Sequence, residues 1–597
     1  MLISRNSTRL VALLLAGAAI LPALAQERPE SILPPGFNEQ TPAPAPVPTP
    51  SSAPTGGYAP PATRLPPNSE PIDLTGLGDN LVQEALPLPL PDPTTIAQYE
   101  LPSYARRSLA QIGIATAADG GMPANAFAGA GGRYLESLMA QLDAPVPSRW
   151  LSIALRRALA SSIATPADVN GADFAAERAW LLLRMGESRI ARALVEAVDT
   201  DNYTPKMYDA ALQVALANGD PALVCPFSAT AKAASRYGGW IALDAICKTL
   251  SGQADGAKEI AALRRARGRD IDVLLADKLA GMAGKRGAVT IEWGGVDQLT
   301  SWRYGMAMAS GEKIPDALFA TVSPRVQFWR AQAPLLSARE RVAAADFAAT
   351  QGVLSSTALV DLYGEIEATE DSNGAEAAVA RDLRAAFSEA DRAMRLAAMV
   401  QLWDEPRGAR ARYARLLLTA RAAAKIAPAR DEQRDRLIAA MLSAGLAAPA
   451  LAWVPVVERG SEGWAMLALA DESMDRLYSR ADVRSYRGGV SGAQQHKRQM
   501  FFAALAGLGR IDASTAQTLA NDFSVDLVRT DAWTRAIERA AQANQPGTVL
   551  LLAGIGMQTP NWHGVPPENF YHIIAAMHRT GLDGEARMMA IEALTRL

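Results

Sequence analysis

The sequence predicts an all-helical (all-α) protein in which short helices repeat one local pattern and pack on their neighbours. Three observations support this fold class: apolar residues recur at helical spacing, glycines interrupt the segments, and a polar or acidic residue follows many of these glycines. Of the 597 residues 49% are hydrophobic but only 6% are aromatic, which suits helices better than a β-sandwich. One pair of such helices cannot bury its apolar face alone, so neighbouring pairs are expected to stack.

The pattern is clearest between Gly171 and Gly252. Asn170 is expected to cap a first helix and Gly186 to end it, because asparagine accepts hydrogen bonds from free N–H groups and glycine tolerates the left-handed conformation at a helix end. A second helix follows Glu187, and a third begins at Pro205. The predicted apolar faces of the three helices comprise Phe174, Leu181, Leu182, Met185, Ile190, Leu194, Val195, Val198, Met207, Ala211 and Val214.

The same order of helix, glycine, polar residue and alanine-rich helix recurs after Gly445, Gly509 and Gly581. Trp180, Leu183 and Gly186 resemble the opening of the tetratricopeptide repeat, although the glycine is displaced and the spacing between copies is irregular. The chain therefore resembles tetratricopeptide-like α-solenoids made of helical hairpins. Over most of residues 96 to 597 it is also similar to a family of bacterial secreted helical-repeat proteins. That resemblance brings no activity and no functional residue with it.

Residues 1 to 25 have the three parts of a secretory signal peptide: a basic start with Arg5 and Arg9, an apolar run from Leu10 to Leu21, and small residues around a cleavage site after Ala25. The apolar run is too short to span a bilayer. We therefore expect a mature chain without a transmembrane segment, located in the periplasm if the cell is Gram-negative.

Residues 26 to 95 are rich in proline, serine, threonine and alanine, and this composition predicts a disordered arm. It serves either as a spacer or as a docking segment. The remaining chain is predicted to form two helical-repeat regions, 96 to 335 and 336 to 597, because residues 286 to 335 are the least regular part. Further helices are expected at 104–114, 375–402 and 409–426, and a polar loop at 485–499.

Cys225 and Cys247 are the only cysteines, and their midpoint falls in the turn-forming sequence Arg236-Tyr-Gly-Gly239. If the chain reverses there, the two thiols lie opposite each other. An oxidising compartment would then join them in a disulfide. The alternative is a pair of buried thiols that pack as small apolar side chains.

Catalytic motifs in the sequence are weak. Ser310 and Lys313 match the Ser-x-x-Lys pattern of penicillin-recognising enzymes, but the other sequence elements of that family are missing. Residues 554 to 560 resemble a segment of lytic transglycosylases, for which Glu538 or Glu187 would be the proton donor.

Metal and polyanion sites are equally weak. Glu568 and His572 have the i, i+4 spacing that a metal could use, but the preferred interpretation places Glu568 near a helix N-terminus and the histidines at a surface or a repeat interface. The arginines of residues 409 to 426 are expected to form a solvated face. We therefore predict no catalytic, cofactor or metal site, and a net charge of −3 gives no basis for nucleic-acid binding.

The leading functional hypothesis is a non-enzymatic periplasmic scaffold or adaptor that binds proteins of the cell envelope through its helical repeats. A cell-wall glycan-acting enzyme, similar to lytic transglycosylases, is one alternative. A carrier of a small ligand is another.

Overall fold

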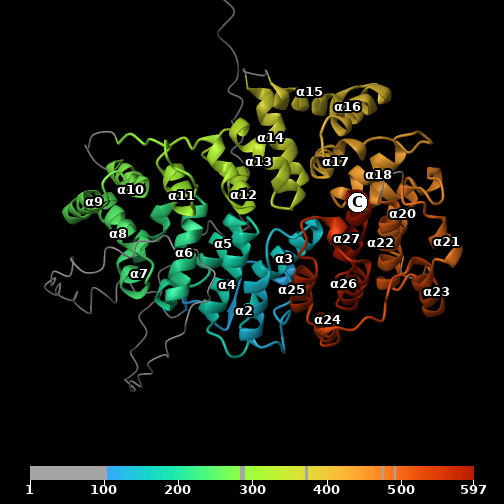
Figure 1. Cartoon of the computed structure of the whole chain (residues 1–597), viewed down its shortest axis with the longest axis horizontal. Helices are drawn as coiled ribbons and strands as arrows, with labels where there is room; N and C mark the ends of the chain where they lie inside the picture. The colour runs from blue at the N-terminus through green and yellow to red at the C-terminus, as the bar shows by residue number, and fades with distance from the viewer. Residues whose placement is uncertain (1–101, 103, 283–288, 370–373, 474–475, 490–492) are drawn as a thin grey trace, which may run out of the picture. The chain divides into compact units, whose positions relative to one another are not determined.

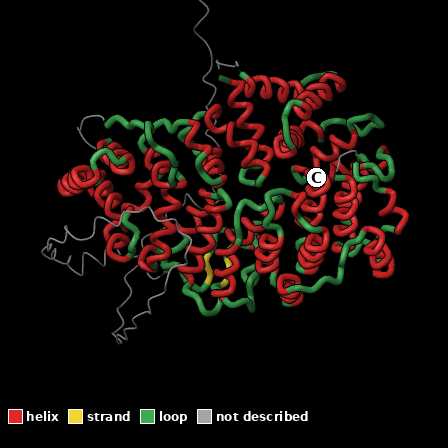
Figure 2. The backbone as a smooth tube through the Cα atoms, viewed as in Figure 1, coloured by secondary structure: helices red, strands yellow, loops and turns green. Residues whose placement is uncertain are grey.

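The computed structural model describes residues 102, 104–282, 289–369, 374–473, 476–489 and 493–597. The all-α prediction is confirmed for this part of the chain, which is almost entirely helices and connecting turns (Figure 2). Within it the only strands are β1 (Gln111–Ile112) and β2 (Ile163–Ala164), which pair antiparallel. The predicted signal peptide and proline-rich arm lie outside the described residues.

The helices of the first part of the described chain are α2 (Gly132–Gln141), α3 (Arg149–Ala160), α4 (Gly171–Arg184), α5 (Ser188–Glu196), α6 (Pro205–Ala217), α7 (Ser228–Ala234), α8 (Gly239–Leu250), α9 (Ala254–Arg267), α10 (Ile271–Gly281), α11 (Ser301–Ala309) and α12 (Pro324–Gln332). Those that follow are α13 (Ala338–Thr350), α14 (Ser356–Ala368), α15 (Ala375–Ser388), α16 (Arg392–Asp404), α17 (Ala409–Ala423), α18 (Arg434–Ser443), α19 (Ala447–Leu451), α20 (Glu462–Ala470), α21 (Arg480–Ser485), α22 (Gln494–Gly507), α23 (Ala513–Phe523), α24 (Ala532–Gln542), α25 (Pro546–Gly556), α26 (Pro567–Arg579) and α27 (Asp583–Arg596). Short 3₁₀ helices include η3 (Pro221–Phe227).

The first predicted helix forms for the expected reasons. The Asn170 side chain accepts a hydrogen bond of 2.8 Å from the Ala172 amide at the start of α4. Gly186 follows the helix with a φ of +89°, and a Cβ atom there would lie 2.4 Å from the Phe328 side chain. Glycine is therefore required at this position both by the backbone conformation and by the close approach of α12.

The predicted helix at 104–114 is wrong, because this segment instead extends into strand β1. Its backbone is held by long-range partners. The Ala110 carbonyl accepts a hydrogen bond of 2.8 Å from the Thr165 amide. The Ile112 carbonyl accepts one of 2.8 Å from the guanidinium of Arg178. These contacts satisfy backbone groups that a helix would have paired internally.

Two further boundaries differ from the prediction. The helix expected over 375–402 is two helices, α15 and α16. The backbone becomes extended at Glu389, which ends α15, and Asp391 caps α16 by accepting a hydrogen bond from the Ala393 amide at 2.5 Å. The loop expected at 485–499 is shorter, since α22 already begins at Gln494.

Consecutive helices pair along most of the described chain, for example α4 with α5 and α6, α8 with α9, α13 with α14, and α17 with α18. Helix α3 adds contacts of another kind. It packs on α25 and α27, which come from the end of the sequence, as well as on α4 and α5 (Figure 1). Helices from both ends of the described chain therefore share one hydrophobic core.

The N-terminus of α3 is joined to α27 by a buried carboxylate. Glu592 accepts hydrogen bonds from the Ser148 hydroxyl at 2.7 Å, and from the backbone amides of Arg149 at 2.8 Å and Trp150 at 3.2 Å. The Arg596 guanidinium completes the set at 2.6 Å. The first N–H groups of a helix lack partners within the helix, and a carboxylate at this position accepts hydrogen bonds from them. Its negative charge is also stabilised by the helix dipole.

Arg178 of α4 is fully buried and binds the C-terminal end of α3. Its guanidinium donates to the carbonyls of Leu159, Ile112 and Ser161. Burial lowers the pKa of Arg178 to about 9. A cation at a helix C-terminus is also favoured by the helix dipole.

Helices α13, α14, α15 and α17 form a hydrophobic cluster of their own, together with Phe328 and Ala331 of α12 and Leu402 of α16. All described residues belong to a unit that spans residues 72 to 597. The division between residues 335 and 336 stays a prediction.

Candidate functional site

A cavity of about 180 Å³ lies among helices α13, α14, α15 and α17. Its apolar lining consists of Val342, Ala343, Ala375 and Val379, and its polar lining of Asp346, Tyr363, Glu376, Glu405 and Arg415. Most of the lining therefore comes from helices that the hydrophobic cluster holds together. Glu405 is supplied by the turn after α16.

Three of the polar side chains form a hydrogen-bonded triad. The Arg415 guanidinium donates to an Asp346 carboxylate oxygen at 3.1 Å and to the Tyr363 hydroxyl oxygen at 2.8 Å. The Tyr363 hydroxyl in turn donates to the other oxygen of Asp346 at 3.2 Å. Burial raises the pKa of Asp346, and the charge of Arg415 and the hydrogen bond from Tyr363 offset part of that rise. Burial also raises the pKa of Tyr363.

The other two carboxylates belong to exposed residues. Glu376 lies in the first turn of α15 and Glu405 follows α16. The charge of Glu405 acts on Arg415 and favours its charged form. Three carboxylates and one guanidinium give the lining a formal net charge of −3 + 1 = −2.

The sequence interpretation missed this site, and its reading of Arg415 as part of a solvated face was wrong. Arg415 is only 9% exposed. It precedes Leu418 by three residues and Ala422 by seven, so it lies on an apolar face of α17, and this spacing was the available signal. Its partners Asp346 and Tyr363 come from other helices, which one sequence cannot bring together.

The two cysteines are brought together as predicted from the turn between them. Cys225 lies in η3 and Cys247 in α8, with their Cα atoms 5.2 Å apart and the sulfur atoms at disulfide distance. The reversal occurs between the end of α7 at Ala234 and the start of α8 at Gly239.

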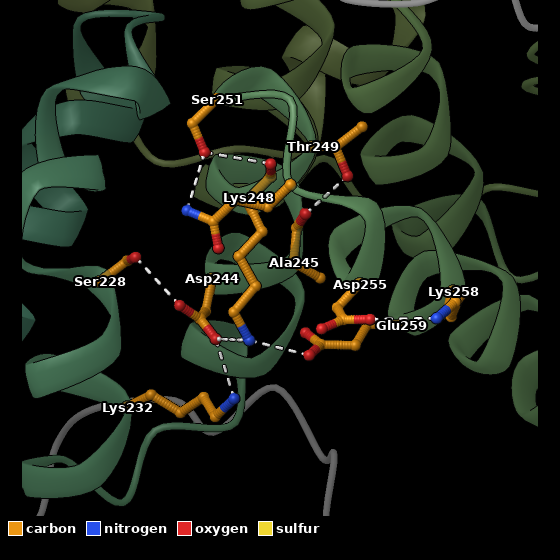
Figure 3. A network of polar contacts seen from close by, with 11 residues as sticks. Ser228, Lys232, Asp244, Ala245, Lys248, Thr249, Ser251, Asp255, Lys258 and Glu259 are labelled. Atoms are coloured by element: carbon orange, nitrogen blue, oxygen red, sulfur yellow. Dashed lines mark hydrogen bonds and ion pairs between the residues drawn. The ribbon is translucent and has the colours of Figure 1, made fainter. Parts of the chain in front are cut away.

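A polar network on α7, α8 and α9 includes Lys248, the residue after Cys247 (Figure 3). Asp244 of α8 is nearly fully buried and accepts from Lys232 at 2.8 Å, from Lys248 at 2.9 Å and from the Ser228 hydroxyl at 3.1 Å. Lys248 also reaches Glu259 of α9 at 2.8 Å. Burial by itself would raise the pKa of Asp244, but the hydrogen bonds and charges of the two lysines outweigh it and hold the pKa below its usual value. The network therefore ties α7, α8 and α9 together.

The two glutamates of the glycan-cleaving hypothesis have structural partners. Glu187 is buried at the start of α5, and the Arg156 guanidinium donates to it at 2.6 Å. Burial raises the pKa of Glu187 against the effect of Arg156. Glu538 of α24 lies 3.2 Å from the Nδ1 atom of His572, which is buried in α26.

The glycines of the transglycosylase-like segment pack helices closely. A Cβ atom at Gly554 would lie 2.6 Å from the Leu142 side chain, and one at Gly556 would lie 2.2 Å from Trp533. Both positions are inside α25, where small residues allow neighbouring elements to approach.

The remaining weak motifs are placed as follows. Ser310 follows α11 and donates to the Ala307 carbonyl at 3.3 Å, while Lys313 is exposed. Glu568 lies in the first turn of α26. Across the described ranges, no group of three or more His, Cys, Asp or Glu side chains is placed to hold a metal ion.

Comparison of the chain with protein-family models, curated proteins and solved structures gives no match. Within the part of the chain that the structure describes, every helix is too short or too polar to cross a membrane.

Proposed function

We propose that this protein is a non-enzymatic scaffold or adaptor of the cell envelope that binds partner proteins through an array of tetratricopeptide-like helical hairpins. The pairing of consecutive helices along the described chain is the observation that carries this proposal. Stacked hairpins present an extended surface built from many helices, which is how α-solenoids bind other proteins. The periplasmic location rests on the signal peptide predicted for residues 1 to 25.

The positions of the glutamates favour the scaffold over the glycan-acting enzyme. A general acid must reach the substrate, yet Glu187 is 4% exposed and paired with Arg156. Glu538 is more accessible, but its carboxylate contacts His572 rather than a second carboxylate. His572 is itself buried in α26, so this contact holds the Glu538 carboxylate against the protein.

The test is site-specific photo-crosslinking in the cell of origin. A photoreactive residue is placed at exposed apolar positions of the helical body, such as Met394 of α16 and Val528 after α23, and at Ser51 of the arm. Cross-linked proteins are identified by mass spectrometry, purified, and titrated against the full chain. A partner that cross-links to the helical body and binds with micromolar affinity or better supports the scaffold.

Two outcomes would overturn the proposal. One is a partner that cross-links at Ser51 alone and is lost when residues 26 to 95 are deleted. The other is cleavage of purified cell-wall glycan by the wild type that disappears in Glu187→Gln or Glu538→Gln.

A further inference from the structure

A second, smaller hollow lies among helices α8, α9, α10 and α11. Leu263, Val273 and Trp302 are its buried lining residues. Tyr237 and Ile241 also line it and are partly exposed, so they form its rim. The hollow is therefore mostly apolar and is reached from solvent between its rim residues.

The size of the hollow suits one aliphatic side chain of a polypeptide. It measures about 40 Å³. One water molecule requires roughly 10–15 Å³, whereas sites for small molecules occupy about 300–1,000 Å³. The aromatic residues Trp302 and Tyr237 in the lining are of the kind that binds proline-rich segments in other proteins.

The lining is held in place by contacts within the helical body. The Trp302 indole Nε1 donates to the Asp272 carbonyl at 3.2 Å. The Asp272 carboxylate in turn accepts from the Arg303 guanidinium at 2.8 Å. A side chain that enters the hollow therefore meets an ordered surface, and less conformational entropy is lost on binding.

The edge of the hollow at the end of α9 carries positive charge. Arg267 lines the hollow, and the neighbouring Arg265 and Arg269 are exposed. Asp270 lies 3.9 Å from Arg267 and offsets one of these charges. An apolar hollow beside a cationic edge favours a segment in which an aliphatic residue is closely followed by an acidic one.

The chain contains such a segment shortly before the described residues. Residues 86 to 93 read Leu-Pro-Leu-Pro-Leu-Pro-Asp-Pro. Asp92 follows Leu90 by two positions, which corresponds to roughly 6 Å at the 3.1 Å rise per residue of polyproline II. Alternating prolines restrict a chain to few conformations, so such a sequence loses little entropy when it binds.

The start of the described chain is held close to the hollow. The Arg107 amide donates to the Asp199 carboxylate at 2.7 Å. Tyr203, four residues after Asp199, contacts Phe227 with the ring centroids 5.1 Å apart. Phe227 contacts Trp240 at 6.4 Å, and Trp240 follows a glycine that lines the hollow. Two ring contacts therefore connect the entry of the chain with the helix that borders the hollow.

The intervening chain is long enough to reach the hollow. From Leu90 to Arg107 it spans roughly 50 Å when extended, at about 3.1 Å per residue. We propose that residues 86 to 93 bind back onto the helical body of the same chain, with Leu90 in the hollow and Asp92 beside Arg267 and Arg269. This contact goes beyond the scaffold proposal and does not depend on it, because it forms within one chain whether or not a protein partner exists.

The test is photo-crosslinking in the purified full chain, with a photoreactive residue in place of Ile241. The protein is kept dilute and mixed with an isotope-labelled copy, so that mass spectrometry distinguishes links within a chain from links between chains. We expect links within the chain to residues 86 to 93. The matched control position is Leu250, which lies on the same helix and is 37% exposed but does not line the hollow.

Substitutions in the full chain test the assigned contacts. Leu90→Ser is expected to lower the yield of these links about tenfold, because it removes one buried aliphatic side chain. Leu74→Ser, elsewhere in the arm, is expected to leave the yield unchanged. Asp92→Arg is expected to lower it about threefold, and Arg269→Glu in the same chain to restore it, since the charges are then exchanged. Thermal melts establish that each variant retains the fold.

Four outcomes would overturn the proposal. Position 241 could link to residues 86 to 93 no more often than position 250 does. The links could join different chains only, which would assign the hollow to a second copy. Leu90→Ser could lower the yield no more than Leu74→Ser, or Arg269→Glu could fail to restore the links that Asp92→Arg removes.

Discussion

Substitution of Glu592 by glutamine is expected to weaken the junction between α3 and α27. The wild-type carboxylate is buried, and it accepts from two backbone amides, a hydroxyl and the Arg596 guanidinium. Glutamine keeps the size of the side chain but removes the charge, and its amide group turns one acceptor into a donor that faces these donors. Arg596 is then left buried without its anionic partner.

The size of the effect follows from this geometry. Removing one partner of a buried ion pair costs about 3–5 kcal/mol, because the remaining charge stays desolvated. Glu592 is 1% exposed and Arg596 is 9% exposed, so little solvent is available to replace the lost interaction. We therefore expect Glu592→Gln to lower the free energy of unfolding by about 3–5 kcal/mol.

Urea unfolding and hydrogen exchange together measure this effect. The amides of Arg149 and Trp150 donate to Glu592, so peptides that contain them should exchange faster in the variant. Glu585→Gln is the matched control, since Glu585 joins the same two helices through Arg157 at 2.7 Å. The Arg157 side chain is 40% exposed, and such surface pairs contribute only about 0–1 kcal/mol. Equal destabilisation by the two variants, or unchanged exchange at 149 and 150, would refute the reasoning.

Three further predictions concern buried polar groups and the disulfide. Arg178→Lys is expected to lower the free energy of unfolding by about 1–3 kcal/mol, which is the cost of leaving a buried carbonyl without a donor. One ammonium group cannot reach all the carbonyls that Arg178 binds. An unchanged urea midpoint would contradict this prediction. Asp244 has a folded pKa below the unfolded value of about 3.9, so its charge stabilises the fold above that pH and the contribution is lost as the pH falls through the folded pKa. Asp244→Asn should therefore show less loss of stability between pH 5 and strong acid, and an acid titration identical to the wild type would count against the network. Cys225→Ser is expected to cost about 3 kcal/mol in the chain-entropy model, and reductant is expected to destabilise the wild type but not the variant. A wild-type unfolding free energy that reductant leaves unchanged would show that the bond is not formed.

The local signals in the sequence were sufficient for much of the helical structure. The cap at Asn170, the left-handed Gly186 and the proline at the start of α6 each act within one or two turns of the chain. The opposed cysteines follow from a short turn between two adjacent segments. Such features depend on neighbouring residues, so periodicity and capping rules predict them.

The errors occurred where distant residues decide the local structure. Residues 104–114 contain enough apolar residues for a helix, yet Thr165 and Arg178 hold their carbonyls in an extended segment. Arg415 belongs to an arginine-rich helix that suggested a solvated face, but Asp346 and Tyr363 neutralise and bury it. For residues 104–114 the tertiary partners outweigh a local helix preference of at most about 1 kcal/mol per residue.

The sequence by itself determined the helical class, most of the helix positions and the pairing of the cysteines, because these depend on interactions between residues close along the chain. Only the tertiary structure decided that α3 packs between helices from both ends of the described chain, that Glu592 caps its N-terminus, and that Glu376 and Glu405 line one cavity. The longest of these contacts joins residues 444 positions apart in the sequence. Their physical basis is the burial of shared apolar surface and the need to satisfy every buried polar group, and both depend on which helices meet in space.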